Sequence, residues 1–283
     1  MARAAPATIA LMLLAMAAFA ANSLLCRVAL RGGHIDPASF GAIRVTAGAL
    51  VLALAMRLRS RPTAPSDWRA AAMLFVYVGA FSFAYLTLPA GTGALILFGA
   101  VQLTMFAVGL VRGERFAPRG WAGLALAVTG FVVLVLPGVA APPAVGSTLM
   151  AVAGVAWGAY SLRGRGVPDP LAATASNFLR AMPLALVLGL AFVARAHADL
   201  AGVLLAIASG ALTSGLGYVI WYAALRGLSS LQAASVQLSV PVIAAVAGAL
   251  WLDEAFTARL LVAVVAILGG IGLVLTDRAR GRG

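Results

Sequence analysis

The chain contains no lysine and only one cysteine among its 283 residues. Without lysine it has neither the P-loop residue that contacts nucleotide phosphates nor an amine for a Schiff base. ATP hydrolysis within this chain and a retinal-type chromophore are therefore excluded. Cys26 has no second thiol for an internal disulfide or a metal cluster. We expect no cofactor.

Charged residues are also scarce, at 10% of the chain against about 25% in soluble domains. Hydrophobic residues make up 63%, and the mean hydropathy is +1.04. The composition therefore predicts an integral membrane protein with the lipid bilayer as its surroundings. The net charge of +12 does not indicate nucleic acid as a partner, because the arginines are scattered and form no dense patch with interleaved aromatics.

Carboxylates are the rarest charged groups, with eight in the whole chain. They are Asp36, Asp67, Glu114, Asp169, Asp199, Asp253, Glu254 and Asp277. All of them map to the ends of apolar segments or to the connections, whereas proton-coupled export of cations usually depends on a carboxylate inside the membrane. Cation antiport is therefore disfavoured. His34 and His197 lie in connections without neighbouring ligands, so we expect no metal site.

Ten apolar segments are each long enough, at about 20 residues, to cross a bilayer. They are Ala7–Cys26, Ala38–Met56, Trp68–Leu88, Gly91–Val111, Gly120–Leu136, Gly146–Leu162, Leu171–Ala194, Leu200–Leu225, Ser229–Leu252 and Leu260–Thr276. The connections are short and leave no room for a soluble domain. The expected fold is an all-α integral membrane protein with ten transmembrane helices.

Landmarks in the first half of the chain recur in the second half. Asp36-Pro37 recurs as Asp169-Pro170, Arg44 as Arg180, Tyr85-Leu-Thr-Leu88 as Tyr222-Ala-Ala-Leu225, Glu114 as Glu254 and Gly130 as Gly270. This spacing predicts two repeats, residues 1–137 and 146–283. Because five spans per repeat is an odd number, the second repeat must be inverted relative to the first.

The arginines predict the orientation of the chain in the membrane. With the N-terminus in the cytoplasm, fourteen arginines lie in inside segments and four in outside segments. This bias fits ten spans with both termini cytoplasmic. In a second interpretation Arg3, the apolar run from Ala7 and the Ala18-Phe-Ala20 site form a cleaved signal peptide, but the first repeat would then lose a span.

The chain resembles the drug/metabolite transporter superfamily, specifically its ten-helix carriers made of two EamA-type repeats, over nearly its full length. The motif is a proline, a glutamate thirteen residues later in a Gly-Glu loop, and a glycine in the next span. The second copy has Pro241, Glu254 and Gly270, with Asp253 in place of the loop glycine; the first has Val101, Gly113-Glu114 and Gly130. The resemblance implies a multi-pass protein of the bacterial inner membrane, often an exporter of amino acids or other small metabolites.

Two arginines lie inside predicted spans, where a charged side chain costs about 2.5 to 3.5 kcal/mol on insertion scales. Neither Arg44 nor Arg180 is therefore expected to face lipid. Two interpretations stay open. Each arginine packs between helices or reaches the membrane interface, or it binds a carboxylate of a substrate.

Further polar and aromatic candidates lie within the spans. Gln237 precedes Pro241 by four residues, so the proline frees the carbonyl of Gln237 and breaks the helix there. Gln102 is placed similarly in the first repeat. The other candidates for a substrate-binding cavity are Asn22, Tyr85, Trp157, Tyr160, Tyr218 and Tyr222. Helix packing and interfacial aromatic belts are the alternative explanations.

Small residues predict where helices approach closely. Gly154 and Gly158 have the GxxxG spacing, and the stretch from Gly210 to Gly217 contains three glycines with Thr213 and Ser214. Close packing is the favoured interpretation of both segments, and a hinge is the second.

Together these features predict a permease for small metabolites, such as amino acids or related neutral, zwitterionic or anionic solutes, that works by alternating access of two repeats. The alternatives are an exporter of drugs or quaternary ammonium compounds and a membrane enzyme or assembly subunit that transports nothing. Intramembrane constellations of His, Asp or Glu are missing, so we expect no enzyme and no catalytic residues. Self-association into a homodimer stays open.

Overall fold

The computed structural model describes residues 6–58, 67–111, 113, 118–136, 138, 141–164, 167–225 and 236–280. These residues are helical apart from short connections and an isolated antiparallel bridge between Ile35 and Ala198. The helices are α1 (Pro6–Arg31), α2 (Pro37–Leu58), α3 (Trp68–Ala84), α4 (Ala90–Val111), α5 (Pro118–Val135), α6 (Ala144–Arg163), α7 (Pro170–Ala191), a short 3₁₀ turn (Val193–Arg195), α8 (Leu200–Ala208), a π-helical segment (Ser209–Leu216), α9 (Gly217–Leu225), α11 (Ser239–Leu252) and α12 (Ala258–Arg280).

Seven helices are long and apolar enough to cross a membrane, and three shorter ones are also apolar. Because α8, the π-helical segment and α9 are continuous, they form one rod, and the described part of the chain contains ten rods. Large apolar side chains are exposed all around them, which in water would be an unusually extensive apolar surface. The predicted all-α membrane fold is confirmed.

Most predicted spans differ from the helices by a few residues. The first helix continues to Arg31 instead of ending at Cys26, so Arg27 lies within it and not in an outside connection. The third span ends four residues early, at Ala84, and the seventh ends at Ala191. The predicted start of the ninth span lies outside the described residues.

Aspartates begin equivalent helices in the two repeats. Asp36 precedes Pro37, and its Oδ1 accepts hydrogen bonds from the amides of Ala38 and Ser39 at 3.0 and 2.9 Å. Asp169 precedes α7, and its Oδ1 accepts from the Ala172 amide at 3.1 Å. A side-chain acceptor at this position satisfies amides that have no partner within the helix.

Aspartate caps also begin α3 and α8. Asp67 and Asp199 accept hydrogen bonds from the amides of Ala70 and Gly202. The Gly202 amide and then the His34 ring hold the pKa of the Asp199 carboxyl below its usual range. His34, expected to have no neighbouring ligand, lies 2.7 Å from Asp199 Oδ2. The connections thus tie the ends of neighbouring helices together.

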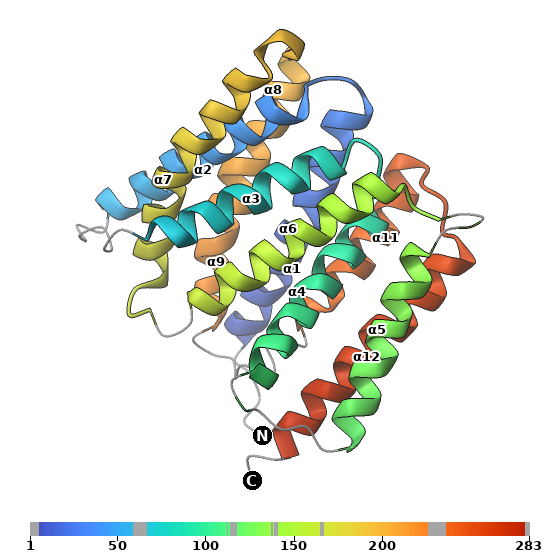
Figure 1. Ribbon diagram of the computed structural model, residues 1–283. Helices are drawn as coiled ribbons and strands as arrows, with labels where there is room; N and C mark the ends of the chain where they lie inside the picture. Colours follow the sequence, from blue (N-terminus) through green and yellow to red (C-terminus); the bar gives the residue numbers. More distant parts are fainter. Residues whose placement is uncertain are drawn as a thin grey trace.

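Helix contacts reveal an approximate two-fold relation between the repeats (Figure 1). Exchange of the repeats converts α1 to α6, α2 to α7, α3 to the α8–α9 rod, α4 to α11 and α5 to α12. α3 and α4 both pack on α6; correspondingly, the α8–α9 rod and α11 both pack on α1. The pairs α2–α7, α4–α11 and α5–α12 convert to themselves. The contacts therefore agree with two inverted five-helix repeats.

Close approach of α6 to α4 depends on two glycines. A Cβ atom on Gly154 would lie 2.6 Å from the Leu97 carbonyl oxygen, and one on Gly158 would lie 3.2 Å from that of Val101. Only glycine lets these backbones come so near without displacement. The predicted GxxxG packing is confirmed.

Candidate functional site

A cavity inside the bundle is lined by side chains from both repeats. The lining residues are Phe19, Asn22, Ser23, Arg44, Tyr77, Phe81, Leu97, Phe98, Trp157, Thr213, Ser214, Tyr218 and Gln237. The free volume is about 30 Å³, which is room for only one or two water molecules. Five of the ten predicted site residues meet here, from five separate stretches of the chain.

Arg44 is the charged residue of this lining and is only 1% exposed. Its Nε donates to Ser214 Oγ at 3.3 Å, and its Nη2 donates to Tyr77 Oη at 3.1 Å. The guanidinium carbon lies 5.3 and 4.8 Å from the ring centroids of Tyr77 and Phe81, within the range of cation–π contacts. The side chain points into the bundle, so the interpretation in which it reaches the membrane interface is wrong.

The third nitrogen of Arg44 differs from the other two. Nη1 is buried and has no hydrogen-bond partner within the part of the chain that the structure describes. Asp and Glu are absent from the residues that line the cavity, so no carboxylate of the lining balances the guanidinium charge. A buried donor without a partner is unusual because its desolvation is not compensated.

Asn22 connects α1 to the π-helical segment of the other repeat. Its Oδ1 accepts from Ser209 Oγ at 2.7 Å and from Thr213 Oγ1 at 3.1 Å. A π-helix widens the turn, and such segments are frequent at functional sites. The π-helical segment supplies hydroxyls to Asn22 and, through Ser214, to Arg44.

The π-helical segment lies close to α2 because of Gly210. A Cβ atom at this position would lie 2.2 Å from the carbonyl oxygen of Arg44, a distance that no side chain can adopt. The Gly210–Gly217 stretch therefore packs closely, as predicted, and this packing brings Ser214 within reach of Arg44.

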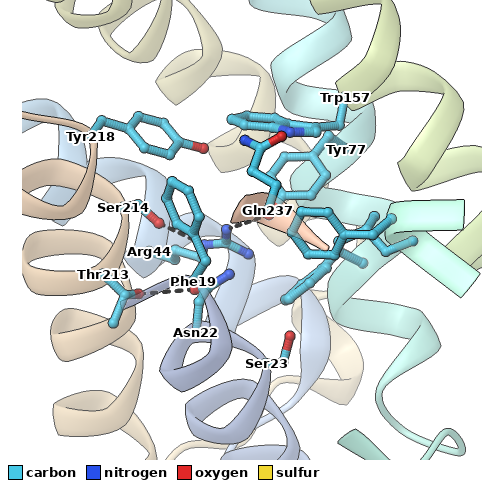
Figure 2. Close-up of a pocket in the computed structure, with 13 residues that line it drawn as sticks. Phe19, Asn22, Ser23, Arg44, Tyr77, Trp157, Thr213, Ser214, Tyr218 and Gln237 are labelled. Atoms are coloured by element: carbon cyan, nitrogen blue, oxygen red, sulfur yellow. Dashed lines mark hydrogen bonds between the residues drawn. The ribbon is translucent and has the colours of Figure 1, made fainter. Parts of the chain in front are cut away.

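Aromatic rings form another part of the lining. The centroid of Trp157 lies 4.8 Å from that of Tyr77 and 5.4 Å from that of Tyr218. Phe19 meets Tyr218 edge to face at 6.1 Å. Figure 2 shows Trp157 and Tyr218 on one side of the Arg44 guanidinium and Asn22 and Ser23 on the other. The cavity thus combines an apolar wall with a small number of polar groups.

Gln237 reaches the cavity from the segment that precedes α11. Residues 236 and 237 are helical, Leu238 interrupts the helix, and α11 begins at Ser239. The predicted break before Pro241 is confirmed. Figure 2 shows the Gln237 amide between Trp157 and Arg44.

Five other predicted site residues lie outside the cavity lining. Tyr85 is fully buried and its hydroxyl donates to the Ala90 carbonyl at 3.3 Å. Gln102 is buried within α4. Their role in binding stays a prediction, as does that of Tyr222, whose side chain is outside the described part of the structure.

The remaining two, Tyr160 and Arg180, form hydrogen bonds with residues of α7. Tyr160 stacks on Trp157, and its hydroxyl accepts from Asn177 Nδ2 at 3.4 Å. Nη1 of Arg180 donates to the Ser176 carbonyl at 2.9 Å and also contacts the Ser176 hydroxyl. Arg180 is therefore partnered within its own helix, unlike its repeat counterpart Arg44.

Eight residues of the lining are not among the predicted site residues. They are Phe19, Ser23, Tyr77, Phe81, Leu97, Phe98, Thr213 and Ser214. Of these, Thr213 and Ser214 were visible as adjacent hydroxyls in a glycine-rich span, and a polar pair at such depth was a usable signal. The apolar lining residues could not be recognised from the sequence. Every face of these helices is apolar, so a residue that faces the cavity does not differ in type from one that faces lipid.

A second, larger cleft of about 340 Å³ lies at the end of the bundle where α1 finishes. Arg27 and Glu254 line it, and Arg27 Nε lies 3.1 Å from Glu254 Oε1. Glu254 Oε2 accepts from the Ala90 amide at 2.7 Å, and Arg27 Nη1 donates to the Tyr85 carbonyl at 3.0 Å. The Glu254 side chain is only 8% exposed although it lies in a connection.

The ion pair lies in the cleft lining, about one turn of α1 from the cavity lining. Ser23 lines the cavity and Arg27 lines the cleft, and the two are four residues apart on one face of α1, about 6 Å along its axis. Glu254 comes from the second repeat, whereas Arg27, Tyr85 and Ala90 belong to the first. The contact therefore joins the repeats across this end of the molecule.

Comparison with known proteins gives matches over nearly the whole chain. The EamA-like transporter family matches residues 6–136 and again residues 144–276. An uncharacterized protein of Pseudomonas aeruginosa is 55% identical over 273 residues, which cover 96% of this chain and 95% of that protein. A solved crystal structure has a TM-score of 0.65 at 21% identity and aligns with 94% of this chain and 98% of its own, which supports the fold alone.

Proposed function

This chain belongs to the EamA-like transporter family, and from that premise we propose that it is a secondary transporter of small metabolites in the bacterial inner membrane. The solutes we propose are amino acids or related neutral, zwitterionic or anionic compounds. The fourteen-to-four distribution of arginines supports cytoplasmic termini. In that orientation the cleft beside Arg27 and Glu254 would face the outer side.

The observation that carries the proposal is a polar cavity enclosed by side chains of both inverted repeats. Movement of one repeat against the other would open such a cavity to one side of the membrane and then to the other. The free volume of about 30 Å³ is too small for a metabolite, so binding must accompany an opening of the bundle.

Reconstitution of the purified chain into liposomes tests the proposal directly. Counterflow is measured with labelled neutral and zwitterionic amino acids, anionic metabolites and a quaternary ammonium dye. We expect counterflow of a metabolite, and a loss of about tenfold or more in Gln237→Leu and in Trp157→Leu, because both side chains line the cavity.

Trp251→Leu is the matched control, because Trp251 is 74% exposed on the surface of α11. Its counterflow should equal that of the original chain. Counterflow confined to the dye would contradict the proposed solute class. An absence of counterflow for every compound, in protein that is folded, would contradict transport itself.

A further inference from the structure

We propose that Arg44 binds the carboxylate of the transported solute through Nη1, and that the rest of the solute is apolar or aromatic. This inference rests on the proposed transport function and names the chemistry of its substrate. It extends that function from a general class of metabolites to solutes with an acid group at one end and an apolar body at the other.

The hydrogen-bonding pattern of Arg44 is incomplete on one side. Ser214 and Tyr77 accept from Nε and Nη2, and both are neutral hydroxyls. The two N–H groups of Nη1 have no partner among the described residues, although the atom is buried. Guanidinium groups bind carboxylates with one or two parallel hydrogen bonds, so a carboxylate oxygen would complete this side of the side chain.

The charge of the cavity points to the same ligand. The lining contains a guanidinium and no carboxylate, and the nearby hydroxyl, amide and aromatic groups carry no net charge. Arg44 is therefore without a counter-ion among the lining residues. In a medium of low dielectric constant, a ligand carboxylate would be attracted strongly, and a cationic ligand would be repelled.

The remaining walls indicate what accompanies the carboxylate. Phe19, Phe81, Trp157 and Tyr218 present rings or ring edges to the cavity. Apolar and aromatic walls with a small number of oriented polar groups are typical of sites for small organic ligands. The Asn22 and Gln237 amides lie on either side of Arg44 and would select among polar groups next to the acid.

A purely structural role would require a different arrangement. The repeat counterpart Arg180 has such an arrangement, because its Nη1 donates to the carbonyl of its own helix. Arg44 faces the cavity with its corresponding nitrogen unpaired. Arg44 is the eighth residue of α2 and Arg180 the eleventh of α7, so the two arginines lie about one turn apart in matching helices. Their different hydrogen-bond partners favour binding over packing for Arg44.

Matched acids and amides test the inference on the detergent-solubilised full chain. Calorimetry would compare phenylacetate with phenylacetamide, L-phenylalanine with L-phenylalaninamide, and L-leucine with L-leucinamide. We expect at least one acid to bind tenfold or more tightly than its amide. Equal binding of acid and amide in every pair, or no binding of any acid, would overturn the proposal.

Variants then assign the preference to Arg44. We expect Arg44→Gln to weaken binding of the acid by about 10- to 100-fold, the effect of losing a charged hydrogen bond, and to change binding of the amide by less than about threefold. Arg195→Gln, which removes an exposed arginine outside the membrane spans, should change neither. Unchanged preference for the acid in Arg44→Gln would overturn the proposal.

Two outcomes separate this inference from the proposed function. If neutral solutes show counterflow in liposomes while no acid binds, transport stands and the role of Arg44 is wrong. If no solute shows counterflow, both are wrong. Should Arg44→Gln fail to fold, the comparison of acids with amides on the original chain decides the question alone.

Discussion

Hydroxyl groups of one short segment satisfy the polar side chains of two other helices. Ser209 and Thr213 donate to Asn22, and Ser214 accepts from Arg44. Since Asn22 and Arg44 belong to the first repeat and the hydroxyls to the second, each of these hydrogen bonds joins the repeats. In the apolar interior such bonds fix the register between helices as well as stabilising them.

Coupling between Asn22 and Thr213 is therefore expected in a double-mutant cycle. Asn22→Leu and Thr213→Val should each lower the free energy of unfolding in detergent, with a coupling of about 0.5 to 1.5 kcal/mol, the range found for hydrogen bonds between membrane helices. Thr104→Val is the control, since the Thr104 hydroxyl donates to the Ala100 carbonyl of its own helix at 2.7 Å. Coupling of Asn22 to Thr104 should be zero, and equal coupling in both cycles would contradict the assignment.

At the level of single residues, the sequence predicted five of the thirteen residues that line the cavity. Asn22, Arg44 and Gln237 were identified because polar groups inside apolar spans are costly and need a reason. Tyr85 and Arg180 are also polar residues within apolar predicted spans, yet each donates a hydrogen bond to a nearby backbone carbonyl. The sequence does not reveal which partner a polar side chain finds, since that depends on how the helices rotate against each other.

Helix starts were easier to predict than helix rotations. Asp-Pro at positions 36–37 and 169–170 begins α2 and α7, because an acceptor followed by proline suits the first turn. The spans themselves follow from the hydropathy of about 20 residues. The π-helical segment, which packs closely against α2 at Gly210, was not predicted, because no local sequence pattern distinguishes it from an α-helix.

Capping by Asp36 predicts a dependence of stability on pH. Burial alone would raise the pKa of this carboxyl, but hydrogen bonds from Ser39, His197 and Ala38 outweigh burial and lower it. The stabilisation is therefore complete above the pKa of an ordinary carboxyl and is lost as the pH falls through the lowered pKa of the folded state. Thermal unfolding should occur at lower temperature as the pH falls from about 5 to 3.

Two substitutions distinguish the effect of the capping hydrogen bonds of Asp36 from the effect of its negative charge. Asp36→Ala should lower the free energy of unfolding at pH 7 by about 1 kcal/mol, the usual effect of losing a cap. Asp36→Asn retains an acceptor without a charge, so it should remain close to the original chain at pH 7 and show a smaller loss in acid. An identical acid dependence in all three proteins would exclude Asp36 as its source.

Over the whole molecule, the cavity, the Arg27–Glu254 ion pair and the larger cleft follow one another along α1. Cys26 lies next to Arg27, is fully buried and is the only cysteine of the chain. Any rearrangement that opens the bundle at this end should expose its thiol. The native chain thus contains a site-specific reporter of opening.

Glu254→Gln should increase the rate at which a membrane-impermeant maleimide, added outside, modifies Cys26 in cells or liposomes. The loss of a partly buried ion pair worth about 1 kcal/mol predicts an increase of about fivefold. The control removes the ion pair between Asp67 and Arg163, which joins α6 to the start of α3 at the opposite end. Asp67→Asn should not increase the rate, and an equal increase in both variants would contradict a local effect.

The exchange symmetry of the helix contacts has a consequence for assembly. Because most of the helix contacts between the described residues convert to one another when the repeats are exchanged, each half presents the surface that the other half recognises. A chain divided within residues 137–143 and produced as two polypeptides should therefore associate without a covalent connection and be recovered as a stoichiometric pair by an affinity tag on either fragment. The peptide bond between the halves would serve mainly to raise their effective concentration.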